Sequence, residues 1–152
     1  MINITFNTAV ILLILISIAL IILIIRYVKN HKGGFDVNEL EGHDFENYCA
    51  ELLKKNGFVE VVVTKGSGDF GADILAEKDM VTYAIQCKVY QSPVGVKAVT
   101  EAHAGRDYYD KMVGAVMTNQ RFTNPAKEAA KKLKILLWDG DYLRDLMDND
   151  DM

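Results

Sequence analysis

The sequence predicts an α/β domain, a mixed β-sheet flanked by helices, that follows one N-terminal transmembrane helix. Residues 8–25 form an apolar run without a charged side chain. After Gly33, segments with apolar side chains at helical spacing alternate with short segments rich in Val and Ile. These segments follow one another as α-β-β-β-α-β-α-β, an order typical of a mixed sheet covered by helices.

The apolar segment at residues 4–25 is long enough to cross a bilayer. Its core, residues 8–25, contains only two polar residues, Thr8 and Ser17. About 20 apolar residues in a helix span a hydrocarbon core of roughly 30 Å. No basic segment precedes the run and no small-x-small cleavage pattern follows it, which disfavours a cleaved signal peptide. A buried core helix is the alternative, but so long an apolar run disfavours that as well.

Basic residues follow the apolar segment directly, while the first six residues carry no charged side chain. By the positive-inside rule, Arg26, Lys29 and Lys32 predict that the N-terminus lies outside and the rest of the chain in the cytoplasm. We therefore expect a single-pass protein of the inner (plasma) membrane.

The chain beyond Gly33 is long enough for one domain with a core and too short for two. Its two cysteines, Cys49 and Cys87, lie in apolar patterns without CxxC or Cys/His spacing, which predicts buried free thiols in a reducing compartment. All 21 acidic residues follow Gly33, whereas three of the 17 Lys and Arg precede it, so this part has a net charge of −7. That charge disfavours general DNA binding, because such binding depends on neutralising phosphates. Any contact with DNA has to be local, metal-assisted or helped by a partner.

The predicted domain covers residues 42–146 and follows a linker at residues 26–41. Its first half contains one helix and three strands. A helix at 43–56 presents an apolar stripe that includes Phe45 and Cys49, and Gly57 is placed to end it in a left-handed conformation. The Gly-rich turn at residues 66–71 separates the first two of three expected strands, which cover residues 59–64, 72–77 and 81–90.

The second half alternates helices and strands. Asn124 is expected to cap a helix that has Pro125 at its first position and runs to residue 133. Asp139 and Gly140 turn the chain into a C-terminal helical segment before an acidic tail at residues 147–152. The remaining expected elements are a helix at 96–109 and strands at 113–118 and 135–138.

Three polar residues on adjacent predicted strands suggest phosphodiester hydrolysis. Asp73 stands at the start of one strand, and Gln86 and Lys88 lie two positions apart on the next. Side chains alternate between the faces of a strand, so Gln86 and Lys88 share a face while Ile85 and Cys87 point the other way. An acid, an amide and an amine so placed could hold a divalent metal and a water beside a phosphate.

Six sequence blocks occur in order: GHDFE from Gly42, GF at Gly57, SGDFGADI from Ser67, YAIQCKVY from Tyr83, VMTNQRFTNPA from Val116 and WDG from Trp138. With these blocks, residues 38–146 resemble the Mrr-like restriction endonuclease catalytic domain, a branch of the PD-(D/E)xK nuclease superfamily. GADI and QCK together are more specific than either alone. In this branch QxK stands where most relatives carry (D/E)xK. The resemblance implies a restriction-endonuclease-like fold and metal-dependent cleavage of DNA.

The resemblance assigns a metal site to three residues. Asp73 is the implied carboxylate ligand, of the oxygen type that Mg²⁺ prefers, and Mn²⁺ is the other expected ion. Gln86 would offer its side-chain oxygen, and the backbone carbonyl of Cys87 another. The plainer alternatives are a turn aspartate after the glycines and a polar residue on a half-solvated strand face.

Two further residues complete the implied catalytic set. Lys88 would lie by the attacking water, steer its proton loss and counter the charge that builds on the phosphate. Glu46 matches a helix acid that often points into the site in this superfamily as an extra metal ligand, but a surface glutamate is the alternative. For Lys88, the alternative to a catalytic role is an ordinary surface lysine whose charge is solvated.

The implied substrate contacts lie around these residues. Ser67, Asp69 and Gly71 resemble the family's loop before the catalytic aspartate, where small residues let a phosphodiester backbone approach, although an ordinary hairpin turn would use the same residues. Gln91, just past the third strand, matches a commonly polar position that touches substrate.

The sequence thus predicts a membrane-anchored, metal-dependent DNA endonuclease acting in restriction, defence or DNA processing. The alternative is a non-catalytic scaffold or nucleic-acid-binding module that keeps the nuclease fold and a membrane tether. The acidic charge and the lack of a DNA-recognition domain favour this alternative, whereas the Asp73, Gln86 and Lys88 set disfavours it. Duplex cleavage requires two active sites, so a homodimer is one expected partner and a separate DNA-recognition protein another.

Overall fold

A computed structural model describes residue 11 and residues 13–24, 36–65 and 70–149 of the chain, which divides into compact units at residues 1–36 and 37–152. In the first unit, the described residues between 11 and 24 are helical and their large apolar side chains are exposed. No helix among the described residues is long and apolar enough to cross a membrane. The rest of the segment predicted to do so, residues 4–25, lies outside the described residues.

The second unit is built on a five-stranded mixed sheet with the strand order β1-β2-β3-β4-β5. Strands β1 (Val59–Val63), β2 (Ile74–Lys78) and β3 (Val81–Lys88) pair antiparallel, and a short turn at Asp79 and Met80 joins β2 to β3. Strands β4 (Val113–Thr118) and β5 (Ile135–Trp138) join in parallel, each after a helical crossover.

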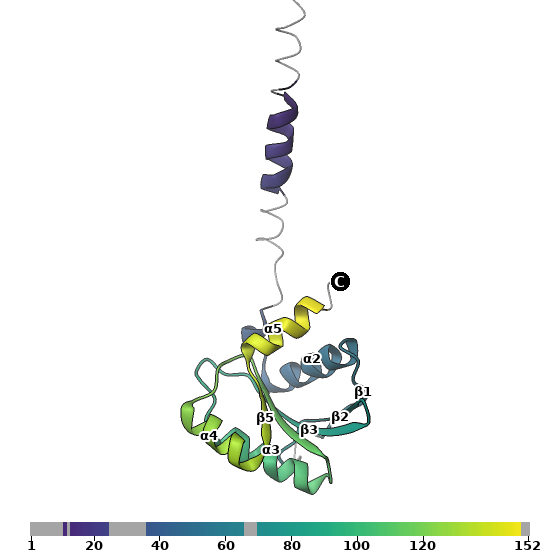
Figure 1. Ribbon diagram of the computed structural model, residues 1–152, viewed down its shortest axis with the longest axis vertical. Helices are drawn as coiled ribbons and strands as arrows, with labels where there is room; N and C mark the ends of the chain where they lie inside the picture. Colours follow the sequence, from purple (N-terminus) through teal and green to yellow (C-terminus); the bar gives the residue numbers. More distant parts are fainter. Residues whose placement is uncertain (1–10, 12, 25–35, 66–69, 150–152) are drawn as a thin grey trace, which may run out of the picture. The chain divides into compact units, whose positions relative to one another are not determined.

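Helices cover both faces of this sheet (Figure 1). On one face pack α2 (Gly42–Lys55) and α5 (Gly140–Asp148), and a short 3-10 helix, η1 (Val37–Glu39), precedes α2. The other face carries the two crossover helices, α3 (Val96–Tyr108) and α4 (Asn124–Leu133). The predicted α/β class and the order of the elements are therefore confirmed.

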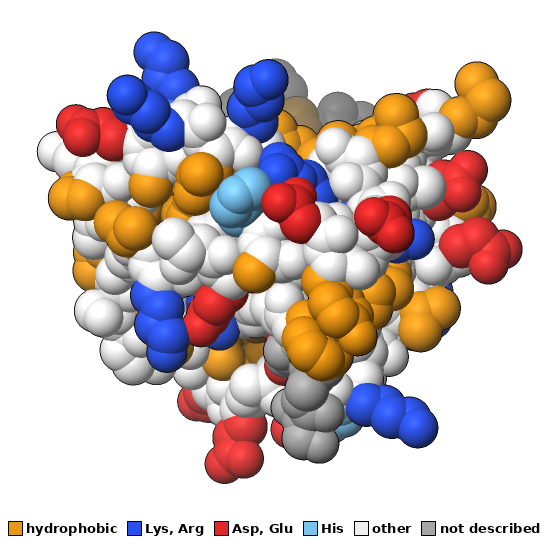
Figure 2. Space-filling view, turned by 90° about the horizontal axis from the view of Figure 1, so that it is seen from below, with side chains coloured by type: hydrophobic (Ala, Val, Ile, Leu, Met, Phe, Trp, Pro, Cys, Tyr) orange, Lys and Arg blue, Asp and Glu red, His pale blue; other side chains and the backbone are white. Residues whose placement is uncertain are grey.

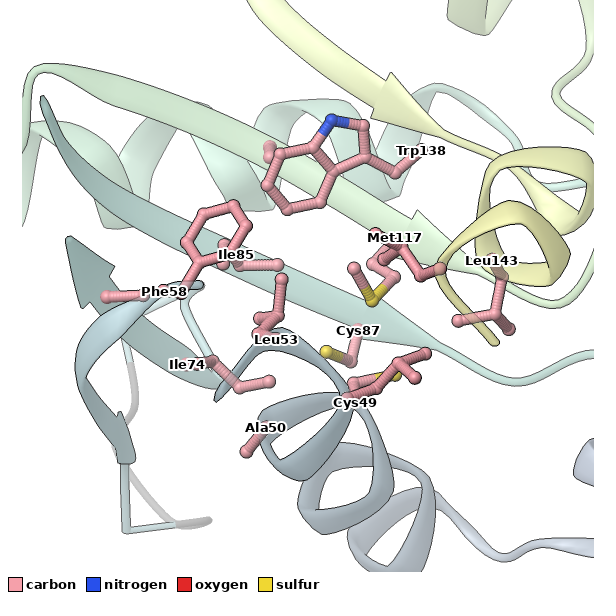
Figure 3. Close-up of a cluster of buried hydrophobic side chains, with 14 of the residues drawn as sticks. Cys49, Ala50, Leu53, Phe58, Ile74, Ile85, Cys87, Met117, Trp138 and Leu143 are labelled. Carbon is pink, nitrogen blue, oxygen red and sulfur yellow. The ribbon is translucent and has the colours of Figure 1, made fainter. Parts of the chain in front are cut away.

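The larger core lies between α2, α5 and the sheet, and Figure 3 shows its side chains. Ile85 and Cys87 of β3 point into this core beside Cys49 and Leu53 of α2. Because strand side chains alternate, Gln86 and Lys88 face the α3 side, as predicted from the period of two. Cys49 and Cys87 are buried free thiols, which confirms the expectation for both.

Helix ends follow local chemistry, with one correction. Gly57 after α2 has a φ of +84°, as expected for a glycine that ends a helix. The cap of α4 is Thr123, whose hydroxyl accepts a hydrogen bond from the Ala126 N–H, so the prediction of Asn124 was wrong by one residue. Both residue types cap well, and Pro125 fits the first or the second helical position. Helix α5 extends to Asp148, two residues into the segment expected to be an acidic tail.

Candidate active site

A cavity of about 580 Å³ opens where β3 ends, between α2 and α3. It collects six of the nine residues singled out from the sequence and adds a residue that was not: Glu101 of α3. Among the described residues, the lining consists of Gly42, Glu46, Gly71, Asp73, Gln86, Cys87, Lys88, Val89, Tyr90 and Glu101.

Asp73 is held in place in this cavity by hydrogen bonds of its backbone and its side chain. Its backbone continues the β2 ladder, because its N–H donates to the Ile85 carbonyl at 2.8 Å and its carbonyl accepts from Thr64 N–H at 2.9 Å. Its side chain is only 4% exposed, and Oδ2 accepts the Cys87 backbone N–H at 2.7 Å. A buried carboxylate is costly unless it is hydrogen-bonded or paired with a cation. The fold therefore holds an anion at the cavity floor.

Gln86 lies against this carboxylate with its amide nitrogen. The Nε2 group donates to Asp73 Oδ2 and, at 3.5 Å, to the Cys87 carbonyl. In this orientation the Gln86 amide stabilises the Asp73 carboxylate by donating a hydrogen bond to it. The oxygen that was expected to bind a metal would face Asp73 only after a half-turn of the terminal amide, which exchanges the positions of its oxygen and nitrogen.

Lys88 is tied to an acid that the sequence did not point to. Its Nζ lies 3.0 Å from Oε2 of Glu101 on α3. Burial works to lower the pKa of Lys88, but the pairing with Glu101, helped by the charge of Asp73, outweighs it and leaves the pKa above its usual value. Lys88 is therefore an ammonium at neutral pH.

Glu46 lines the cavity from α2. Its side chain is 18% exposed, and Oε2 lies 3.1 Å from Nδ1 of His43 one turn earlier. His43 itself is 69% exposed, so this pair adds little stability. Its effect is to orient the Glu46 carboxylate at the cavity wall.

Two glycines bring α3 against the strand that carries Asp73. Gly71 has a φ of +93°, and a Cβ on it would lie 2.2 Å from the Glu101 carbonyl oxygen. A Cβ on Gly105 would lie 2.5 Å from the Gly71 carbonyl oxygen. This contact sets the position of α3, and hence the side chain of Glu101, relative to Asp73 and Lys88.

Of the remaining sequence-predicted contacts, one described residue, Gln91, does not line the cavity. Ser67 and Asp69 lie outside the described residues. Gln91 is exposed and donates to the Asn38 carbonyl at 3.2 Å, so its side chain anchors the η1 segment. Asn119 connects the same two segments, because its side chain donates hydrogen bonds to Asn38 Oδ1 and to the Tyr90 carbonyl, both within 2.9 Å.

Cys87 contributes its backbone and not its thiol. A hydrogen bond with Cys49 and burial raise the pKa of Cys87 well above its usual value. A protonated, buried thiol is neither a nucleophile nor a metal ligand. Its backbone N–H and carbonyl both lie in the cavity region, on Asp73 and Gln86.

The donor set suits a hard divalent cation. Among the described residues, no three His, Cys, Asp or Glu side chains converge as ligands. Mg²⁺ does not require such a cage, because it is commonly held by one or two carboxylates, with waters and substrate phosphates completing its shell. Asp73, the Gln86 amide and the Cys87 carbonyl supply oxygens of this kind, and Asp73 is a buried anion that a cation would neutralise.

The face of the domain that Figure 2 shows mixes charges of both signs. In the view of Figure 2, acidic side chains lie among the lysines and arginines, and apolar side chains separate them. This face therefore has no continuous basic area of the kind that binds DNA without metal or partner.

A family model described as restriction endonuclease, Mrr_cat, matches residues 37–147. No curated protein matches the chain. Solved structures with a similar fold include a protein of unknown function, AF1548, with a TM-score of 0.56 and 23% identity over 70% of this chain and 65% of that one. The DNA modification-dependent restriction endonuclease AspBHI has a TM-score of 0.51 and 15% identity, covering 78% of this chain and 32% of its own. The MspJI restriction endonuclease in complex with a 27-mer oligonucleotide has a TM-score of 0.50 and 17% identity, and the match covers 84% of this chain and 30% of that one. The chain thus spans less than two thirds of the length of each of these proteins.

Proposed function

Because the chain belongs to the Mrr_cat family of restriction endonuclease domains, we propose that it is a membrane-anchored, divalent-metal-dependent DNA endonuclease. The observation that carries this proposal is the meeting of Asp73, Gln86 and Lys88 in one cavity, with Asp73 buried as an anion. The likeness to an endonuclease solved with an oligonucleotide supports DNA as the substrate.

Each side chain has one task in this proposal. Asp73, the Gln86 side-chain oxygen and the Cys87 carbonyl hold Mg²⁺ or Mn²⁺, which would supply a Lewis acid for the scissile phosphate and lower the pKa of a bound water. Lys88 acts as a cation that orients the attacking water and stabilises the negative charge that grows on the phosphate. Glu46 adds a carboxylate on the α2 side of the same cavity.

The QxK variant has a consequence for metal binding. An amide oxygen is a weaker ligand than a carboxylate, and Gln86 must turn its amide from the orientation that hydrogen-bonds Asp73. Metal binding and the release of this hydrogen bond are therefore coupled. The described part of the lining also holds three carboxylates against one lysine, charges that repel a DNA phosphate until a cation is bound.

The N-terminal segment is the proposed anchor. Ser17, one of its two polar residues after Asn7, donates its hydroxyl to the Ile14 carbonyl at 2.8 Å within the helix, so the Ser17 hydroxyl is paired in a way that suits an apolar surrounding. The basic residues that follow the segment support a position of the nuclease domain on the cytoplasmic side of the inner membrane, by the positive-inside rule. A homodimer would supply the second active site that duplex cleavage requires.

DNA cleavage by the full-length chain in detergent tests the proposal. The substrates are plasmid DNA, unmodified and methylated, with Mg²⁺ or Mn²⁺. Wild-type protein is expected to cleave, and Asp73→Ala and Lys88→Ala are expected not to. Lys131→Ala and Asp148→Ala serve as matched controls, because each removes an exposed charge that does not line the cavity.

The same assay separates the enzyme from the non-catalytic scaffold. The scaffold remains the second candidate because residues beyond Gly33 carry a net charge of −7. Cleavage that survives both cavity substitutions would point to another site or another protein. If every substrate and ion leaves the DNA intact while the chain still binds it, the scaffold is the better account.

A further inference from the structure

Glu101 is the one acid of the cavity that no sequence pattern indicated, and its position is closely defined. Its Oε2 atom is shielded from solvent and lies 3.0 Å from Lys88 Nζ. Its Oε1 atom lies 3.6 Å from Nζ of Lys97, whose side chain is 88% exposed. The pair with Lys88 is thus the stronger of the two, because the exposed ammonium is screened by water.

The backbone fixes this carboxylate relative to the metal-binding strand. The Glu101 carbonyl packs on Gly71, two residues before Asp73, at a distance that excludes any side chain there. Gly105, one turn further along α3, packs on the same residue. Helix α3 therefore cannot shift to withdraw Glu101 without losing these contacts.

The charges of the cavity leave Lys88 two acidic partners. Among the residues that the structure describes, the lining contains three carboxylates, on Glu46, Asp73 and Glu101, and one ammonium, on Lys88. Asp73 is the other acid whose charge acts on Lys88. A lysine side chain has a flexible four-carbon stem, so it can move between neighbouring anions. An ammonium on Asp73 would occupy the position that a divalent cation needs.

We propose that Glu101 is a positioning residue that holds the Lys88 ammonium away from Asp73 and so keeps this carboxylate available to the divalent cation. The inference rests on the proposed function, since it takes Asp73 as the metal ligand. Glu101 acts here through Lys88 and does not bind the cation. Loss of its charge would let Lys88 turn to Asp73 and compete with the metal.

Binding of Mn²⁺ to the full-length chain in detergent, measured by calorimetry without DNA, tests this role independently of cleavage. Four proteins form a cycle: wild type, Glu101→Gln, Lys88→Met and the double variant. We expect Glu101→Gln to weaken Mn²⁺ binding by about 10-fold, in the range for residues that support a metal ligand. In the Lys88→Met background the same substitution is expected to have no effect, because there is no ammonium left to hold.

Two further variants sharpen the result. Glu101→Asp is expected to recover part of the affinity, because it restores the charge at a shorter reach. Lys97→Met, which removes the exposed partner of Glu101, is expected to leave the affinity within about twofold. Thermal unfolding of each variant in EDTA checks that the domain is folded.

The outcomes separate this inference from the proposed function. If Glu101→Gln weakens Mn²⁺ binding equally with and without Lys88, Glu101 acts on the cation directly and the inference is wrong. An unchanged affinity in Glu101→Gln also contradicts it. If Mn²⁺ binding survives Asp73→Ala, the proposed metal site itself fails, and the role of Glu101 fails with it.

Discussion

Asp73 shows how backbone geometry prepares a site before any ligand arrives. Its carboxylate is buried because its N–H and carbonyl belong to the sheet ladder, and the Cys87 N–H and the Gln86 amide compensate its charge. The pairing of Gln86 and Lys88 on one strand face could be predicted from the sequence, since it depends only on the period of two. Glu101 could not be predicted, because its place depends on the packing of Gly105 against Gly71, which are far apart in sequence.

Gln86→Glu tests whether Gln86 compensates Asp73. The substitution places a second carboxylate where an amide donor now meets Asp73. We expect it to lower the free energy of unfolding in EDTA by about 1–3 kcal/mol, because two buried acids then repel and a hydrogen bond is lost. Mg²⁺ should reverse the loss and raise the melting temperature more than in wild type.

Gln91→Glu is the matched control, since Gln91 is an exposed glutamine outside the cavity. Its response to Mg²⁺ in the same thermal unfolding experiment should equal that of wild type. An equal response of Gln86→Glu and Gln91→Glu would show that position 86 does not bind the cation.

Gly71→Ala tests the contact that positions α3. The new Cβ would lie 2.2 Å from the Glu101 carbonyl oxygen, at a residue with a φ of +93°. We expect destabilisation by about 2 kcal/mol or more, from overpacking and from the unfavourable backbone conformation. Chemical denaturation of the full-length chain measures it.

Gly42→Ala is expected to change the free energy of unfolding in the opposite direction in the same experiment. A Cβ on Gly42 has no neighbour within 4 Å, and the residue is the first of α2. Its replacement should stabilise the domain by up to about 1 kcal/mol, because glycine loses more backbone entropy on folding. Equal effects of both substitutions would contradict the packing described for Gly71.

At the scale of elements, local rules fixed most of the domain. The expected bounds of β4 and β5 and the expected end of α4 agree with the structure, because short apolar runs define the two strands. The cap of α4 was misplaced by one residue because Thr123 and Asn124 are both good caps, and only the hydrogen bond to Ala126 distinguishes them. Local sequence rules do not predict which strands pair across the helical crossovers, because that pairing is set by tertiary packing.

The C-terminal end of α4 offers a prediction at this scale. Lys134 ends the helix with φ 56° and ψ 47°, a left-handed conformation that glycine adopts without strain. Lys134→Gly should therefore stabilise the domain by about 0.5–1 kcal/mol. Lys127→Gly, at an exposed position in the helix interior, should destabilise it by about 1 kcal/mol. Thermal unfolding of both decides whether the conformation or the charge at 134 governs the end of the helix.

At the scale of the whole molecule, an acidic domain is combined with an apolar N-terminal helix. Residues beyond Gly33 have a net charge of −7, so neither an anionic lipid surface nor DNA would attract this part over a distance. Under the proposed function, attachment to the membrane would depend on the apolar segment, and attachment to DNA on a cation bound in the cavity.

The anchor is tested by two lysines in the apolar helix. Ile16→Lys with Leu20→Lys places two charges in the segment, each costing about 3 kcal/mol at the centre of a membrane helix. We expect the variant to move from the membrane fraction to the soluble fraction of cells. Ser17→Ala, which removes a hydroxyl already bonded within the helix, should stay in the membrane fraction. Membrane retention of the double variant would contradict the anchor.

The central claim is that Asp73 makes this cavity a metal-dependent nuclease site. The most direct measurement is the rate of plasmid cleavage by the full-length wild type and by Asp73→Ala, each in Mg²⁺, after EDTA, and after Mg²⁺ is restored. We predict that wild-type cleavage stops in EDTA and returns with Mg²⁺, and that Asp73→Ala is at least about 100-fold slower throughout. Equal rates for the two proteins, or cleavage that is indifferent to EDTA, would contradict the account.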